Sequence, residues 1–327
     1  MDSNPKPDGG AVASETEPER RIFGVGAIMI GVAAALWFGA ATIVARELRY
    51  PSFLDGDRGD VRGAHVPKDA PNGDPEISFG ASFEPVTIFA GSGDSVPAWL
   101  IPAKPTVLGA VVLAPSSGAE RGAMLPYAKF LHAAGLTVLA IDSGDSASTG
   151  TSWGIHEAGL LIAAADWLKS HGYSRIAALG VSEGAAAAIL AQAQRPVFNA
   201  IVSDSAYARL GAMFERVPSI GGLNPAFAQT VLGESWLWLG QNPNDVSPRE
   251  AVSKRNGAAL MIIQNHGDQI TPEDDGRAIA AAAGPSTELW IVSSNGHGDA
   301  IFEKPDEYAS RVTRFLAHAF DAGLTGG

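Results

Sequence analysis

Three side chains of this sequence have the types and the chain order needed for nucleophilic catalysis. Ser182 stands at the centre of the pentapeptide GVSEG, Asp268 follows in NHGDQITP, and His297 follows in SNGHGDAIF. In such a set the histidine takes the proton of the serine hydroxyl and later protonates the leaving group, while the acid holds the imidazole tautomer and stabilises its charged form. The sequence therefore predicts a Ser182 nucleophile, a His297 base and an Asp268 acid.

The segment around Ser182 predicts a strand, a sharp turn and a helix. The apolar run 176–179 is typical of a strand buried on both faces, and an Ala-rich run of strong helix formers follows the serine. Gly180 and Gly184 allow close backbone approach around a strained, exposed serine, which is the geometry of a nucleophile elbow. The hydroxyl then lies at a helix N-terminus, where free N–H groups favour negative charge.

An oxyanion hole next to this serine requires two N–H groups. One is expected from Glu183, directly after the nucleophile, and the other from the loop after the strand 108–114. That loop reads APSSG, and because Pro115 has no N–H, Ser116 or Ser117 must supply the second donor. Carboxylates in the loop after the strand 137–141, among them Asp145, are interpreted as turn residues.

Each predicted role has a competitor elsewhere in the chain. A second GxSxG match, GTSWG around Ser152, lies in a loop well beyond the preceding strand, so we interpret it as a turn. His266 is an alternative base, although it would leave the same strand end as Asp268. Asp204, at the end of the strand 198–202, is the alternative acid.

Composition excludes several classes of function. The formal net charge of −12 argues against a nucleic-acid partner, which requires a basic face. The chain has no cysteine, which excludes disulfides, thiolate nucleophiles and cysteine-based metal sites. The predicted chemistry requires no metal and no organic cofactor, because serine and histidine supply the nucleophile and the base. The oligomeric state cannot be derived from the sequence.

The N-terminal part of the chain predicts a membrane anchor. Residues 1–21 read as a disordered tail, residues 22–45 as a transmembrane helix without charged side chains, and residues 46–75 as a stalk. As a helix, 22–45 spans about 36 Å, enough for a hydrocarbon core of about 30 Å. A buried core helix and a cleaved signal peptide are the alternatives. Basic residues flank both ends, so orientation stays open, with an extracytoplasmic hydrolase domain slightly preferred.

The remainder, residues 76–327, predicts one α/β domain. A short antiparallel lead-in is expected at 76–82, 84–90 and 96–102, with Pro97 making the third an edge strand at best. Strands then alternate with helices, which predicts a mostly parallel sheet with helices on both faces. Residues 206–256 interrupt the alternation and are expected to form a small helical cap. The expected strands are 108–114, 137–141, 176–179, 198–202, 260–264 and 288–292, and the helices 121–134, 155–171, 275–283 and 306–322.

From about residue 84 to 320 the sequence resembles the α/β-hydrolase superfamily, closest to its serine esterase, lysophospholipase-like and dienelactone-hydrolase-like branches. The resemblance rests on LGVSEGAAAAI, SDSAYARL, DQITP and GHGDA. The family's acid is followed four residues later by proline, as Asp268 is by Pro272. Two features depart from the pattern: Ala114-Pro115 replaces the His-Gly that opens the oxyanion loop, and the His-Gly before the acid turn is shifted.

The resemblance implies a serine hydrolase that cleaves a carboxylic ester or thioester of a small-molecule or lipid acyl substrate, and the predicted helix 22–45 would anchor it to a membrane. An amide-cleaving peptidase with the same triad is one alternative. A catalytically idle, membrane-tethered binding module is the other, and the altered oxyanion loop is the feature that favours it. The large apolar residues of the cap either line an acyl pocket or pack the cap onto the body: Phe214, Phe227, Trp236, Leu237 and Trp238.

Overall fold

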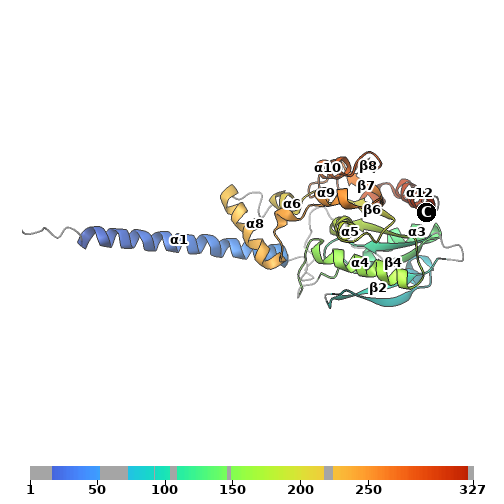
Figure 1. The fold of residues 1–327 in the computed structure, drawn as a ribbon, viewed down its shortest axis with the longest axis horizontal. Coiled ribbons are helices and arrows are strands. Elements are labelled where there is room, and N and C mark those ends of the chain that lie inside the picture. The colour runs from blue at the N-terminus through green and yellow to red at the C-terminus, as the bar shows by residue number, and fades with distance from the viewer. Residues whose placement is uncertain are drawn as a thin grey trace, which may run out of the picture.

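The computed structural model describes residues 17–51, 73–91, 93–103, 109–145, 149–216 and 224–322, with the backbone alone for 17–26 and 322. Most of the predicted tail (1–16) and of the predicted stalk (52–72) lies outside these residues. The helix α1 (Glu17–Arg49) includes the last residues of the tail and the first of the stalk. It extends away from the body of the molecule (Figure 1).

The core of the molecule is an eight-stranded sheet in the order β1-β2-β4-β3-β5-β6-β7-β8. Strands β3 to β8 are parallel, and β2 pairs antiparallel with both β1 and β4. The central strands are buried at every position, as continuous apolar runs require. The predicted, mostly parallel sheet is therefore confirmed. The strands are β1 (Glu84–Phe89), β2 (Ser95–Ile101), β3 (Ala110–Ala114), β4 (Thr137–Ile141), β5 (Ile176–Val181), β6 (Ala200–Asp204), β7 (Ala259–Asn265) and β8 (Glu288–Val292).

Helices cover both faces of this sheet, as predicted. Helices α4 (Ile155–Ser170), α5 (Glu183–Gln194) and α10 (Glu273–Ala283) pack on one face. Helices α3 (Leu125–Ala133) and α12 (Pro305–Ala322) pack on the other. Two apolar cores result, one on each side of the strands. The predicted helix 121–134 begins with a 3-10 turn, η2 (Arg121–Met124), and α11 (Ala300–Glu303) precedes α12.

Two predictions for the lead-in were wrong. The predicted strand 76–82 is the helix α2 (Pro75–Phe79), because Asp74 caps its N-terminus and accepts from the Ile77 N–H, while Gly80 ends it at a φ of 72°. The strand β2 lies between β1 and β4, although it contains Pro97. Pairing with β4 begins only at Ala98, and the Pro97 carbonyl accepts from the Asp142 N–H. The backbone nitrogen of Pro97, which has no N–H, therefore faces a position beyond the end of β4, so the pairing of β2 with β4 does not require it as a donor.

Between β6 and β7 the chain is helical, as expected of the interval 206–256. It contains α6 (Leu210–Arg216), α8 (Pro225–Leu239), η3 (Pro243–Asp245), α9 (Pro248–Ala251) and η4 (Val252–Lys254). Helix α8 lies beside the C-terminal part of α1 (Figure 1). Within α1, the segment Ala27–Arg49 is long and apolar enough to cross a membrane.

Candidate active site

Ser182 lies between β5 and α5 in the conformation of a nucleophile elbow. Its φ is 55° and its ψ is −114°, a backbone region that costs a non-glycine residue about 1–3 kcal/mol. Three hydrogen bonds hold it there. The Ser182 N–H donates to the Asp204 carbonyl over 2.8 Å, and the Ser182 carbonyl accepts from Ala185 and Ala186 over 3.1 Å each. The neighbouring strand and the helix together therefore impose the strained turn.

The two glycines of GVSEG are required by close contacts. A Cβ at Gly180 would lie 2.2 Å from the Gly184 carbonyl oxygen, and a Cβ at Gly184 would lie 2.3 Å from the Ala114 carbonyl oxygen. The first contact brings α5 against β5, and the second brings it against the end of β3. No side chain fits at either position without moving the elbow.

His297 lies between the two other residues predicted to act with it. It follows β8, its Nε2 is 2.7 Å from Ser182 Oγ, and its Nδ1 is 2.7 Å from Asp268 Oδ2. Because an ionised carboxylate only accepts, the Nδ1–H donates to Asp268 and Nε2 is left to accept from the serine hydroxyl. The structure thus brings Ser182, His297 and Asp268 into one hydrogen-bonded line.

Asp268 is itself held by the turn that follows β7. Its Oδ1 accepts from the N–H groups of Ile270 and Thr271 over 2.8 and 3.0 Å, and the Thr271 hydroxyl lies 2.9 Å from Oδ2. The same hydroxyl lies 3.2 Å from His297 Nδ1. Thr271 therefore supports the contact between acid and base. Sequence reasoning missed it, although aspartate side chains commonly accept from backbone N–H groups that follow them closely in the chain.

The alternative residues have other partners. The Asp204 carboxylate accepts from Ser205 and from the Tyr308 hydroxyl, each over 2.9 Å, and burial raises its pKa to about 6. His266 is exposed and pairs with Glu273. Ser152 is buried, donates to Glu157 and accepts from the His156 N–H. These contacts agree with a turn at the second GxSxG motif.

The predicted oxyanion donors lie at the N-terminus of α5 and in the loop after β3. Glu183 is the first residue of α5, so its N–H has no acceptor within the helix. The contact between Gly184 and the Ala114 carbonyl brings the loop of Ser116 and Ser117 to this helix end. The Ser117 hydroxyl donates to Asp145 over 2.8 Å, which ties the loop down.

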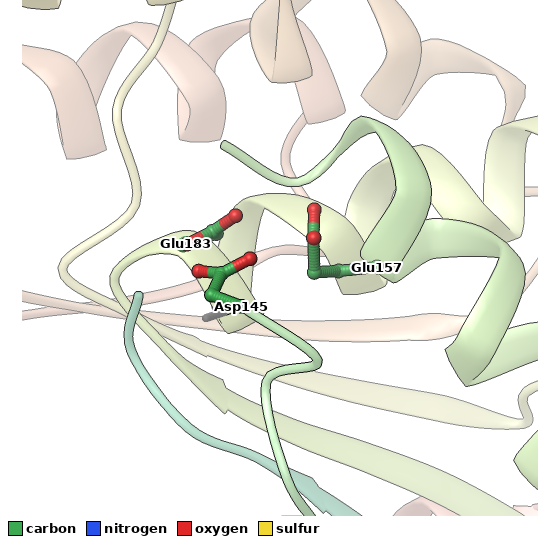
Figure 2. Close-up of side chains that lie close together, drawn as sticks. All are labelled: Asp145, Glu157 and Glu183. Carbon is green, nitrogen blue, oxygen red and sulfur yellow. The ribbon is translucent and has the colours of Figure 1, made fainter. Parts of the chain in front are cut away.

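Behind this helix end three carboxyl groups lie close together, those of Asp145, Glu157 and Glu183 (Figure 2). Burial, followed by the charge of Glu157, raises the pKa of Asp145 to about 7. Burial and the two neighbouring carboxylates raise the pKa of Glu183. The interpretation of Asp145 as a turn residue was therefore incomplete, because three distant segments build the cluster.

The carboxyl oxygens of the cluster are of the type that divalent cations prefer, but the chain already supplies donors to each group. Glu183 accepts from the Gly154 N–H over 2.8 Å and from the Thr151 hydroxyl over 3.1 Å. Glu157 accepts from the Gly154 N–H as well, and Asp145 from Ser117. Such an arrangement fits the raised pKa values of the buried Asp145 and Glu183 carboxyl groups.

The loop that bonds to Glu183 also receives the end of α1. The Thr151 N–H donates to the Arg49 carbonyl over 2.8 Å, and the Arg49 guanidinium donates to the Thr151 carbonyl over 3.0 Å. The Trp153 indole N–H donates to the Leu48 carbonyl over 2.7 Å. Thr151 is therefore hydrogen-bonded both to Arg49 at the end of α1 and to Glu183, the residue directly after Ser182.

The apolar residues of the cap mostly pack rather than line a pocket. Phe214 is buried with its ring 5.4 Å from that of Trp153. Phe227 and Trp238 contact aromatic rings of α1 and of the residue that follows it. Trp236 and Leu237 are exposed. For the first three residues, packing is therefore the interpretation that the structure supports.

No protein-family model and no curated protein matches this sequence. Solved structures do match. The esterase Pf2001 of Pyrococcus furiosus is 23% identical with a TM-score of 0.61, over 76% of this chain and 96% of that one. A puromycin-hydrolyzing peptidase of Mycobacterium tuberculosis is 18% identical with a TM-score of 0.59, over 73% and 39% of the chains. The α/β hydrolase GrgF from Penicillium sp. sh18 is 18% identical with a TM-score of 0.58, over 73% and 99%. The chain therefore has the fold of the α/β-hydrolase superfamily.

Proposed function

We propose that this protein is a serine hydrolase that cleaves a carboxylic ester or thioester through an acyl-enzyme on Ser182. The observation that supports this most directly is the line of hydrogen bonds from Ser182 through His297 to Asp268, with 2.7 Å at each step. The strained backbone of Ser182 and the burial of Asp268 support the same function. Both features lower local stability, and both are typical of catalytic sites.

In the first half of the reaction the Ser182 oxygen attacks the acyl carbon while His297 Nε2 takes the hydroxyl proton. The carbonyl oxygen gains the negative charge, and the N–H groups of Glu183 and of Ser116 or Ser117 bind it. When the intermediate collapses, the bond to the leaving group breaks, and the alcohol or thiol leaves with the proton from His297. Asp268 stabilises the imidazolium throughout.

In the second half water replaces the leaving group. His297 takes a proton from the water as its oxygen attacks the acyl carbon, and the same oxyanion donors bind the second intermediate. The bond to the Ser182 oxygen then breaks, the serine regains the proton, and the carboxylic acid leaves. The chain's own residues suffice for every proton transfer in this cycle.

The proposal includes a membrane anchor formed by α1. The charge-free stretch 22–45 and the exposed apolar side chains of α1 support it, because such a surface is costly in water. An anchored hydrolase of this kind acts on acyl substrates at or near a bilayer.

An amide-cleaving peptidase is the second candidate, and the peptidases among the structural neighbours favour it. Both candidates use the same triad, so they differ in which acyl bond reacts. A panel of acyl esters, acyl thioesters and aminoacyl amides separates them: the proposal expects the highest kcat/KM on the esters or thioesters, and a preference for the amides would replace it.

The first test is labelling of the full-length protein in detergent with a fluorophosphonate probe. We expect labelling of the wild type and of Ser152→Ala, and none of Ser182→Ala. Thermal unfolding of both variants controls for misfolding, since Ser152 is buried. A folded wild type that does not react would overturn the proposal and favour the idle binding module.

A further inference from the structure

Helix α8 presents a face without charged residues of its own, on which Gln229 is the position bonded to another described helix: its side-chain amide donates to Glu215 of α6 over 3.1 Å. Glu234 is the one charged residue of α8, and it turns toward α1, where it accepts a hydrogen bond from the Thr42 hydroxyl over 2.6 Å. Trp236 and Leu237 are among the most exposed large apolar residues of the described chain. The exposed positions of α8 are Pro225, Ala226, Gln229, Gly233, Trp236 and Leu237.

Helices α1 and α8 run side by side in the same direction. Near the start of α8, the Trp37 and Phe227 rings lie 5.0 Å apart. Farther along, Thr42 meets Glu234, and the ring of Tyr50, directly after α1, lies 6.3 Å from that of Trp238 at the end of α8. Helix α8 therefore lies against the C-terminal half of the segment that is long and apolar enough to cross a membrane (Figure 1).

This register places α8 at a definite depth if α1 crosses a bilayer. The charge-free stretch ends at Ala45, and Trp37 lies about 12 Å before it along the helix. The N-terminal turns of α8 are level with this apolar stretch. The C-terminal turn of α8, with Trp236 and Trp238, is level with Arg46 and Tyr50, and tryptophan, tyrosine and arginine are enriched where a bilayer meets water.

We propose that α8 is inserted beside α1 in the membrane leaflet next to the hydrolase body, with its exposed face in contact with lipid. The proposal rests on the membrane anchor of the proposed function. The occupant of the surface is lipid because the α8 face continues the exposed apolar surface of α1, whose side chains Ile30, Leu36 and Ile43 are uncovered.

The catalytic edge of the sheet lies on the same side of the molecule as this helix pair. The end of α1 bonds to Thr151 and Trp153, and Thr151 bonds to Glu183 next to the nucleophile. Helices α6 and α8 follow β6, whose carboxyl end supplies the carbonyl that holds Ser182. With α8 in the leaflet, an acyl substrate dissolved in the bilayer would therefore approach Ser182 from the side of the molecule that carries α8.

The absence of cysteine allows a direct test in the full chain. Single cysteines at Ala226 and Leu237 carry a nitroxide label, in vesicles of phosphatidylcholine and phosphatidylglycerol. Ile30 of α1 is the membrane reference, and Ile77 of the body is the matched control, since Ile30, Ile77 and Leu237 are 73%, 74% and 76% exposed. Collision rates are measured with oxygen, which concentrates in lipid, and with a water-soluble nickel complex.

We expect oxygen-to-nickel ratios at Ala226 and Leu237 that are several-fold above that at Ile77, with Ala226 the deeper of the two. Ratios at both sites equal to that at Ile77, with a high ratio at Ile30, would overturn the proposal and leave the anchor intact. A low ratio at Ile30 as well would overturn the anchor itself. Protection from both reagents at Leu237 would show that protein, such as a second copy, covers α8, and would also overturn the proposal.

Discussion

At the scale of single residues, the contacts of the two candidate acids differ in kind. Asp268 contacts the ring nitrogen of His297 that faces away from Ser182, whereas the Asp204 carboxylate bonds to Ser205 and Tyr308. Asp268 is therefore placed to fix the tautomer of His297. The Asp204 carboxylate instead supports the end of β6, whose carbonyl accepts from the Ser182 N–H.

The kinetic consequences of the two acids therefore differ. We expect Asp268→Asn to lower kcat by about 10⁴-fold, because the amide favours the wrong imidazole tautomer. Asp204→Asn keeps an oxygen for Tyr308 and is expected to lower kcat far less. Steady-state rates on a short-chain ester, with thermal unfolding as the control for folding, compare the two variants. A larger kcat loss in Asp204→Asn would exchange the proposed roles.

The buried carboxyl cluster predicts a pH dependence of stability. Burial raises the pKa of Asp145 from 3.8 to about 7, so between these values the folded state keeps a proton that the unfolded state has lost. The free energy of unfolding should therefore fall as pH rises from about 4 to about 7, and level off above that range.

The variant Asp145→Asn tests this dependence, because the amide does not titrate. Urea unfolding at a series of pH values should show a smaller decline in stability for Asp145→Asn than for the wild type over the same range. Asp166→Asn, which removes a carboxylate from an exposed ion pair, is the control and should follow the wild type. Equal slopes for the wild type and Asp145→Asn would contradict a raised pKa at Asp145.

At the scale of elements, the sequence predicts best what short-range patterns determine. The continuous apolar runs and the glycines around Ser182 predicted β5, the elbow and α5, and the loops of Asp268 and His297 followed from the strands before them. The helix α2 was missed because its apolar residues resemble a strand, although Asp74 before a proline and Gly80 after Phe79 are helix-end signals.

Contacts between distant segments could not be predicted in this way. The carboxyl cluster joins the loop after β4, the start of α4 and the start of α5, and no local pattern indicates that these meet. Helix α8 has an apolar sequence that suits a lid over an acyl pocket as well as a partner for α1. Tertiary packing decides between these arrangements, and α8 packs on α1.

This packing predicts the effect of removing α1. Without residues 1–50, the apolar side of α8 that covers Ala41, Ala45 and Leu48 loses its partner, and Thr151 and Trp153 lose their bonds to the end of α1. We expect the truncated protein to unfold at a lower temperature than the full chain in the same detergent, and to aggregate without detergent. The variant Arg49→Ala, which removes one of these bonds, should have a much smaller effect. A truncated protein as stable as the full chain would contradict the importance of this packing.

At the scale of the whole molecule, α1 and α8 lie together at one side of the body (Figure 1). The end of α1 bonds to Thr151, and Thr151 bonds to Glu183, the residue directly after Ser182. If α1 crosses a bilayer as proposed, Ser182 is on the side of the hydrolase domain that faces the membrane. In this proposal a substrate dissolved in the bilayer approaches Ser182 past α8, whereas a substrate dissolved in water does not depend on the insertion of α8.

A charge on the exposed face of α8 should therefore act on one class of substrate. In vesicles, we expect Ala226→Lys to raise KM for a long-chain ester embedded in the bilayer. Ala226 lies in the first turn of α8, level with the charge-free stretch of α1, where a buried ammonium keeps α8 out of the leaflet. The kcat and KM for a water-soluble short-chain ester should not change, since Ala226 lies at the end of α8 beside Trp37, and the end of α1 that bonds to Thr151 is at the other end of the helix pair. Ile77→Lys, at an exposed position on the body, should change neither substrate's kinetics. Equal effects of Ala226→Lys on both esters would indicate damage to the site rather than loss of access to lipid, and would contradict delivery of the substrate from the leaflet.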